Sequence, residues 1–251
     1  MISGFMARDV VLLHGFTHTG ASWDPVVAAL GERYRALAPD IRGHGSRSEL
    51  EPVSLAAVVD DLARQAPERF TLAGYSMGGR IALHAALALG PRIDRLVLIG
   101  ASPGIADPAE REARRADDDA LAAEIEELDI EAFARRWAQT PVLVGQPPAV
   151  LAAVQADRLR NRPAGLERAL RGLGTGALPS LWDQLGEIRL PVALVVGERD
   201  AKFRAIAREM AAALPEASVV VVPGAGHAVH LEAPDAVAGV ISRSQATQPE
   251  G

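Results

Sequence analysis

The chain has 251 residues, of which 49% are apolar, so it is long enough for one large domain or for a domain that carries an insertion. Its formal net charge is −6 and no basic stripe stands out, which argues against nucleic acid as the main partner. It contains no cysteine, and this excludes disulfide bonds, thiolate catalysis and cysteine-ligated zinc.

The N-terminal segment MISGFMARDV does not combine a basic region with a long apolar stretch, so we predict no signal peptide. No apolar run approaches the roughly 20 residues that a membrane-spanning helix needs. We therefore expect a cytoplasmic protein without membrane insertion, and the lack of cysteine fits a reducing compartment. No feature of the sequence indicates an oligomeric state.

Six short apolar segments predict β-strands. Each is almost entirely apolar rather than alternating, which is typical of strands that are buried on both faces of a parallel sheet. In chain order they begin at Val10 (VVLLHG), Tyr34 (YRALAPD), Phe70 (FTLAGYS), Asp94 (DRLVLIGAS), Pro191 (PVALVVGERD) and Ser218 (SVVVVPGAGH).

Helical patterns accompany these strands. Repeated alternation of strands and helices indicates a doubly wound α/β fold with a mostly parallel sheet. The predicted helices cover residues Ala21–Leu30, Ser54–Gln65, Met77–Leu89, Phe203–Leu214 and Pro234–Ile241.

One interval interrupts the alternation. From about Pro103 to Asp183 the sequence contains no convincing strand and is rich in Ala, Arg, Glu and Leu. A single crossover between two strands needs far fewer residues. We therefore predict a core of residues 1–102 and 184–251, with residues 103–183 as a helical cap over the carboxyl edge of the sheet. A set of ordinary crossover helices is the alternative.

The segment Gly74-Tyr75-Ser76-Met77-Gly78 has the pattern G-x-S-x-G between a predicted strand and a predicted helix. A direct reversal from strand to helix crowds the backbone, so the flanking positions favour glycine and the central hydroxyl is exposed. The N–H groups at the start of the helix are free and carry a partial positive charge. We therefore predict Ser76 as the reacting hydroxyl and the Met77 N–H as an oxyanion donor. A chance turn is the alternative.

A serine needs a histidine to act as a base or a nucleophile, and the histidine needs a carboxylate that orients it. After this type of turn, the acid and then the histidine follow at later strand ends. Asp200 follows VALVVGER and His227 follows VVVVPGAG, so we predict them as the partners of Ser76. Glu198 competes for the acidic role, and the alternative role of Asp200 is to cap the helix that begins near Lys202.

The second oxyanion donor is expected in the loop LLHGFTHTG after the first strand, where the Phe16 N–H is placed to point at the pocket. The other histidines that we considered receive structural interpretations. His14 brings the chain to the sheet edge, His44 lies in a loop, and His84 lies inside a helix. His230 is expected to form a pocket wall.

Arg80 follows Ser76 by four residues and therefore lies on the same face of the predicted helix. It also falls near the start of that helix, where the helix dipole disfavours a cation. A cation in this position, beside a reactive hydroxyl, points to an anionic partner. A surface arginine, or one that is paired with the cap, is the alternative.

Taken in order, the segments HGF, GYSMGG, GERD and GAGH resemble the α/β-hydrolase superfamily over nearly the whole chain, with its first two strands missing or abbreviated. Within it, GASPGIADPAEREARRADD, WAQTPV, RLRN, LRGLGTGALPSLW and GERDAKFRAIA closely resemble the MenH family, the 2-succinyl-6-hydroxy-2,4-cyclohexadiene-1-carboxylate (SHCHC) synthases of menaquinone biosynthesis. This resemblance extends through the predicted cap, where α/β-hydrolases usually diverge, and is therefore far more specific than the G-x-S-x-G pattern.

The resemblance implies roles for individual residues, beginning with Ser76, Asp200 and His227 as the catalytic triad. Arg114 and Arg160 of the predicted cap would bind substrate carboxylates, and Arg111 or Arg115 is the alternative to Arg114. The residues that line the family's pocket correspond to Tyr75, Arg80, the cap arginines Arg114 and Arg160, Trp137, and Lys202 and Phe203 of a DAKF loop.

The family reaction is a 2,5-elimination, in which SEPHCHC, a succinylated cyclohexene with several carboxylates, loses pyruvate to give SHCHC. Three arginines suit a small substrate with several carboxylates because guanidinium groups bind carboxylates bidentately. In this interpretation Ser76, made basic by His227 and Asp200, removes a ring proton. No acyl-enzyme is required, and no metal or organic cofactor is implied.

The triad would serve acyl transfer equally well, because a fold does not determine the chemistry of its site. The first alternative is therefore a carboxylesterase or a C–C bond hydrolase that acts on a small anionic substrate. The second is a binding protein that kept the fold, which the intact Ser, Asp and His disfavour. The resemblance in the cap favours the lyase.

Overall fold

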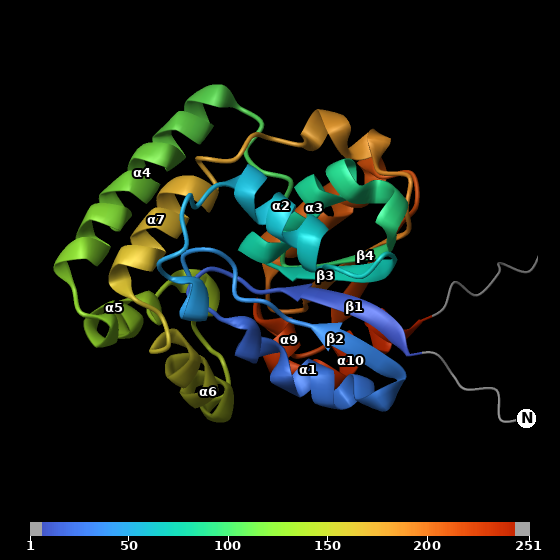
Figure 1. The fold of residues 1–251 in the computed structure, drawn as a ribbon, viewed down its shortest axis with the longest axis horizontal. Helices are drawn as coiled ribbons and strands as arrows, with labels where there is room; N and C mark the ends of the chain where they lie inside the picture. The colour runs from blue at the N-terminus through green and yellow to red at the C-terminus, as the bar shows by residue number, and fades with distance from the viewer. Residues whose placement is uncertain (1–6, 244–251) are drawn as a thin grey trace, which may run out of the picture.

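A computed structural model describes residues 7–243 of the chain. Residues 1–6, on which the prediction of no signal peptide partly rests, lie outside the described residues, as do residues 244–251. Six strands form one parallel sheet in the order β2-β1-β3-β4-β5-β6 (Figure 1). Their bounds are β1 (Arg8–Leu13), β2 (Tyr34–Leu37), β3 (Phe70–Tyr75), β4 (Ile93–Ile99), β5 (Val192–Gly197) and β6 (Ala217–Val222).

All six predicted strands are present, and the predicted α/β fold is confirmed. Successive residues of a strand face opposite sides of the sheet. In β1, Val11 and Leu13 join the hydrophobic cluster on one face, whereas Val10 and Leu12 join the cluster on the other. Burial on both faces holds for the inner strands but not for the edge strands, and Val221 of β6 is 40% exposed. An edge strand has a neighbouring strand on one side only.

Two layers of helices cover the sheet. Helices α2, α3 and α8 pack on one face and α1, α9 and α10 on the other, as Figure 1 shows for most of them. No helix between residues 7 and 243 is long and apolar enough to cross a bilayer. The bounds are α1 (Asp24–Leu30), α2 (Leu55–Gln65), α3 (Met77–Leu89), α8 (Ala201–Ala213), α9 (Val229–Glu232) and α10 (Pro234–Ser242).

Capping residues explain where several helices begin. The Ser54 side chain accepts a hydrogen bond from the Ala57 N–H and so caps the start of α2. The predicted helix 21–30 is instead divided, because a 3-10 turn over residues 20–23 precedes α1, which starts at the Asp24–Pro25 pair. Proline is favoured in a first helical turn, where its missing N–H costs nothing.

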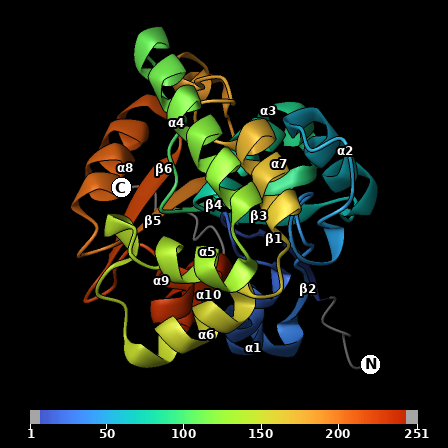
Figure 2. The ribbon, with the colours of Figure 1, turned by 90° about the vertical axis from the view of Figure 1, so that its left-hand side faces the viewer.

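Four helices lie between β4 and β5, and no strand occurs among these residues. Figures 1 and 2 show them gathered beside the end of the sheet at which the strands finish. They have a small hydrophobic cluster of their own, which includes Phe133 of α5 and Leu166 of α7. These residues are helical, as predicted. Their division from the core as a separate cap domain stays a prediction. Residues 103–183 are called the cap segment below. Its helices are α4 (Pro108–Glu127), α5 (Ile130–Trp137), α6 (Pro148–Arg158) and α7 (Pro163–Leu173).

Candidate active site

Ser76 occupies the turn between β3 and α3 with a φ of 51° and a ψ of −109°, a conformation that is strained for a residue with a side chain. The backbone around it is crowded. A Cβ atom at position 78 would lie 2.5 Å from the His14 carbonyl oxygen, so only glycine lets α3 start this close to the end of β1. The turn therefore places the Ser76 side chain at the carboxyl edge of the sheet.

Ser76, His227 and Asp200 lie in hydrogen-bond contact. The His227 Nδ1 atom lies 2.6 Å from the Asp200 Oδ2 atom, and the His227 Nε2 atom lies 3.3 Å from the Ser76 Oγ atom. Since a carboxylate only accepts hydrogen bonds, Nδ1 carries a proton and donates a hydrogen bond to Asp200. The Nε2 atom is then free to accept the Ser76 proton, which is the arrangement that activates a serine.

The two predicted roles of Asp200 coexist. While one carboxylate oxygen accepts from His227, the other accepts from the Phe203 N–H at 3.2 Å and caps α8. This hydrogen bond from the Phe203 N–H orients the carboxylate toward the histidine ring. The competing residue, Glu198, instead accepts a hydrogen bond from the Gly224 N–H at 2.8 Å.

The loop after β1 lies directly against the serine. A Cβ atom at Gly15 would lie 2.7 Å from the Tyr75 ring and 3.5 Å from the Ser76 Cβ atom. Among the described residues, no backbone carbonyl accepts a hydrogen bond from the Phe16 N–H. Met77 is the first residue of α3, where the N–H has no acceptor within the helix. The assignment of these two amides as oxyanion donors stays a prediction.

Aromatic side chains surround the triad. The Phe203 ring lies 4.5 Å from the His227 ring, and the Tyr75 ring lies 5.3 Å from it, measured between centroids. Trp137, at the end of α5, packs on Phe16 with a centroid distance of 5.2 Å. Burial raises the pKa of Tyr75, so its hydroxyl stays protonated. All three predicted aromatic residues thus lie beside the triad or beside its neighbouring loop.

Arg80 is buried and lies one helical turn after Ser76. Its side chain is 8% exposed and its Nε atom lacks a hydrogen-bond partner; among residues 7–243, no carboxylate forms an ion pair with it. Burial and the nearby charge of Arg114 lower the pKa of Arg80 to about 10, while Asp118 opposes this shift. A buried, unpaired cation is costly to the folded protein, which points to an anion as its partner.

Arg114 is the one of the three candidate cap arginines whose charge reaches Arg80. It forms an ion pair with Asp118 at 2.7 Å and remains partly exposed. Asp118 is itself buried and also accepts from the Gly176 N–H, which holds the ion pair in place. This geometry favours Arg114 over Arg111 and Arg115.

The structure places Arg160 at the surface and its neighbour Arg158 in the interior. The Arg160 side chain is 64% exposed and lies 3.9 Å from Asp157. Arg158 is 2% exposed, its charge acts on Tyr75, and its Nη2 atom has no hydrogen-bond partner among residues 7–243. Burial lowers the pKa of Arg158 to about 10. Sequence analysis missed Arg158, although the RLRN segment contains both arginines.

The remaining buried histidines do not contact Ser76. His14 accepts a hydrogen bond from the Ile41 N–H at 2.9 Å, and His230 packs between Tyr75 and Trp23. Burial lowers the pKa of His14 and of His84 to about 4, so both are neutral at pH 7. Within the described part of the chain, no three acidic or histidine side chains are grouped to hold a metal ion.

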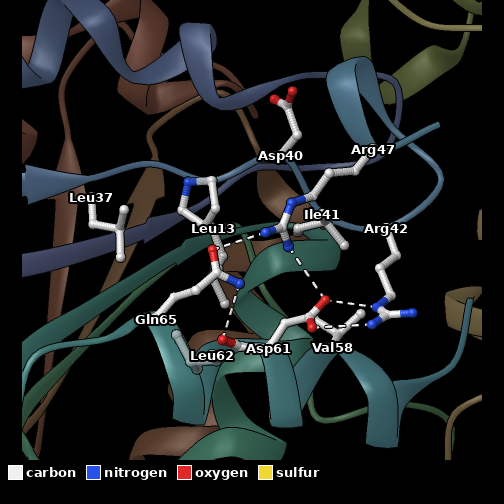
Figure 3. A pocket seen from close by; sticks show the side chains of 11 residues that line it. Leu13, Leu37, Asp40, Ile41, Arg42, Arg47, Val58, Asp61, Leu62 and Gln65 are labelled. Carbon is white, nitrogen blue, oxygen red and sulfur yellow. Dashed lines mark hydrogen bonds and ion pairs between the residues drawn. The ribbon is translucent and has the colours of Figure 1, made fainter. Parts of the chain in front are cut away.

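A small cavity beside α2 is separate from this site (Figure 3). It has room for about one water molecule. Arg42 and Arg47 both bond to Asp61 there, and Arg47 also bonds to Gln65. Its two arginines are thus paired, in contrast to Arg80.

We expect a Gly100→Ala substitution to displace His227. Gly100 has a φ of +53°, and a Cβ atom there would lie 2.8 Å from the His227 ring. The ring would have to move, and small displacements of catalytic groups are costly, so turnover should fall by at least about tenfold. The measurement is kcat together with the melting temperature.

Gly31→Ala is the matched control for this substitution. Gly31 also has a positive φ, +64°, but no atom lies within 4 Å of its Cβ position. Both variants should lose about 1–2 kcal/mol of stability from backbone strain. An equal loss of turnover in both would show that strain, and not the position of His227, is responsible.

Comparison with known proteins identifies the family of the chain. Residues 10–240 match the alpha/beta hydrolase family. A protein of Bacillus subtilis (strain 168), provisionally named a 2-succinyl-6-hydroxy-2,4-cyclohexadiene-1-carboxylate synthase, is 37% identical over 94% of this chain and 89% of its own. The synthase of that name from Salmonella paratyphi C (strain RKS4594) is 33% identical over 94% of this chain and 91% of its own length.

The solved structure of MenH from S. aureus superposes with a TM-score of 0.87 at 32% identity and covers 93% of this chain and 91% of that protein. The six-stranded parallel sheet agrees with these similarities. The chain therefore belongs to the α/β-hydrolase family and, within it, to the family of 2-succinyl-6-hydroxy-2,4-cyclohexadiene-1-carboxylate synthases.

Proposed function

We propose that this protein is a carbon–oxygen lyase of menaquinone biosynthesis that releases pyruvate from SEPHCHC and forms SHCHC. The names of the relatives reported above support the reaction. The substrate is a small molecule with several carboxylates, and we assign the reaction to the cytoplasm.

The observation that carries the proposal is the buried guanidinium of Arg80, a residue one helical turn after Ser76, which forms no ion pair with a carboxylate of residues 7–243. A serine hydrolase for neutral esters has no need of a buried cation at this place, whereas a substrate carboxylate would neutralise it. Arg158 supplies a second buried cation from the cap segment, and Arg114 a third that is partly exposed. We propose these three arginines as the carboxylate-binding groups and assign no such role to Arg160.

In the proposed mechanism the triad acts as a general base. The Ser76 oxygen takes a proton from the substrate ring while its own proton passes to His227, and Asp200 stabilises the imidazolium. The electron pair shifts through the ring and breaks the carbon–oxygen bond, so pyruvate leaves as its enolate and then takes up a proton. The Phe16 and Met77 amides are proposed to stabilise enolate charge, which is worth about 10²–10³ in rate for each donor.

The test is a coupled assay with the enzyme that precedes this step, in which released pyruvate is reduced by lactate dehydrogenase and NADH loss is followed. Pyruvate release that depends on this protein is the expected result, together with slow or undetectable turnover of p-nitrophenyl acetate. Fast ester hydrolysis with an acyl-enzyme burst, and no pyruvate from the cyclohexene, would reject the lyase in favour of a hydrolase.

A further inference from the structure

The end of α6 holds the loop after β1 through one buried carboxylate. The Asp157 Oδ2 atom lies 3.1 Å from the His18 Nδ1 atom and accepts from the Thr19 N–H at 2.9 Å. Its Oδ1 atom accepts from the Thr19 hydroxyl. All three residues are at most 7% exposed, so water cannot easily replace these hydrogen bonds.

Two more side chains from the same stretch hold the preceding residue. Asn161 donates to the Thr17 carbonyl oxygen at 2.8 Å, and the Arg158 Nε atom lies 3.4 Å from the Thr17 hydroxyl. The Asn161 side-chain oxygen also accepts from the Gly45 N–H at 3.0 Å. Asp157, Arg158 and Asn161, here called the latch, therefore contact each of residues 17–19.

The conformation that the latch holds is a strained one. Thr17 has a φ of +69°, in the left-handed region that a β-branched residue avoids. A residue in this conformation is strained and persists only where its surroundings fix it. Thr17 directly follows Phe16, whose N–H is the proposed oxyanion donor, so the direction of that N–H depends on the same turn.

We infer that Asp157 is a positioning residue for the oxyanion loop, residues 15–19: by holding His18 and Thr19 it lets the cap segment set the direction of the Phe16 N–H. The inference rests on the proposed function, which assigns that N–H its role. It makes the cap segment part of the rate-determining geometry and not only a wall of the substrate pocket. Asp157 itself does not touch the reacting atoms in this arrangement.

The experiment compares Asp157→Ala with Asp157→Asn. Alanine removes all three hydrogen bonds, whereas asparagine can keep them: its oxygen accepts from His18 and the Thr19 N–H, and its amide donates to the Thr19 hydroxyl. We expect alanine to lower kcat by about 10²-fold with a small change in KM, because misplacing a catalytic group affects mainly the transition state. Asparagine should keep kcat within about threefold of the unmodified enzyme.

Arg168→Ala is the matched control, since it removes another contact between the cap segment and the core. Arg168 donates to the Ser48 carbonyl oxygen at 2.8 Å and does not contact the oxyanion loop. We expect it to leave kcat unchanged even where it lowers the melting temperature. Equal kcat losses for Arg168→Ala and Asp157→Ala, or an unchanged kcat in folded Asp157→Ala, would overturn the inference.

A second readout separates this inference from the proposed function. A fluorophosphonate reagent inactivates an activated serine through a charged transition state that also uses the oxyanion donors. Asp157→Ala should slow this inactivation about 10²-fold, on the scale of one lost donor, whatever the natural substrate is. An enzyme that releases no pyruvate would refute the proposed lyase, whereas an unchanged inactivation rate in Asp157→Ala would refute the positioning role.

Discussion

Replacing Ser76 by alanine is expected to lower kcat for pyruvate release by about 10²–10⁴-fold, the usual contribution of general base catalysis. The Ser76 Oγ atom lies 3.3 Å from His227 Nε2, so the substitution removes the group that would take the ring proton. Alanine keeps the strained turn, and the melting temperature should therefore not change. The measurement is kcat in the coupled pyruvate assay, with substrate affinity from calorimetry.

Ser48→Ala is the control for this substitution. Ser48 is a buried serine outside the triad; its hydroxyl donates to the Gly45 carbonyl oxygen, and Ser48→Ala should keep full turnover. A His227→Ala variant and the Ser76/His227 double variant should each lose about as much activity as Ser76→Ala, because the residues of a triad act as a unit. Activity above a tenth of the unmodified level in Ser76→Ala would show that another group takes the proton.

Arg80→Met is expected to make the protein more stable and less active at the same time. At pH 7 the guanidinium is charged, because even its lowered pKa of about 10 lies well above that pH. Replacing an unpaired buried charge with an apolar side chain of similar size should add about 1 kcal/mol of stability, or 2–4 °C in melting temperature. Loss of the carboxylate partner should lower kcat/KM by roughly 10²–10³-fold, since such a contact is worth about 2–5 kcal/mol.

Arg42→Met is the matched control, since Arg42 is as buried as Arg80, both being 8% exposed. Arg42, however, bonds to Asp61 through two atoms at 2.6 and 3.1 Å. Its removal leaves part of a buried carboxylate unpaired, so the melting temperature should fall while turnover per folded molecule stays the same. Opposite shifts in melting temperature for the two variants support the role of Arg80. A fall in both would show that Arg80 is a structural residue.

Local chemistry explains why much of the fold and of the candidate triad can be predicted from the sequence alone. The four inner strands were recognisable as apolar segments because a strand buried on both faces tolerates few polar residues. The turn around Ser76 was predictable because only glycine fits where α3 starts against β1. Helical periodicity likewise placed Arg80 one turn after Ser76 without any tertiary information.

The choice between similar residues in one short stretch depended instead on distant partners. In RLRN the sequence does not distinguish Arg158 from Arg160, and the packing of α6 against residues 17–19 buries the first of them. Asp157 has no recognisable motif either, because its partners lie more than 130 positions earlier in the chain.

By itself, therefore, the sequence determined the strand order along the chain, the serine turn and the spacing of Ser76, Asp200 and His227 at strand ends. Each of these features is recognised from a pattern in the few residues that surround it. Only the tertiary structure decided which cations are buried without a partner and which side chains hold the oxyanion loop. Burial and pairing are properties of segments brought together from distant parts of the chain, and no local pattern records them.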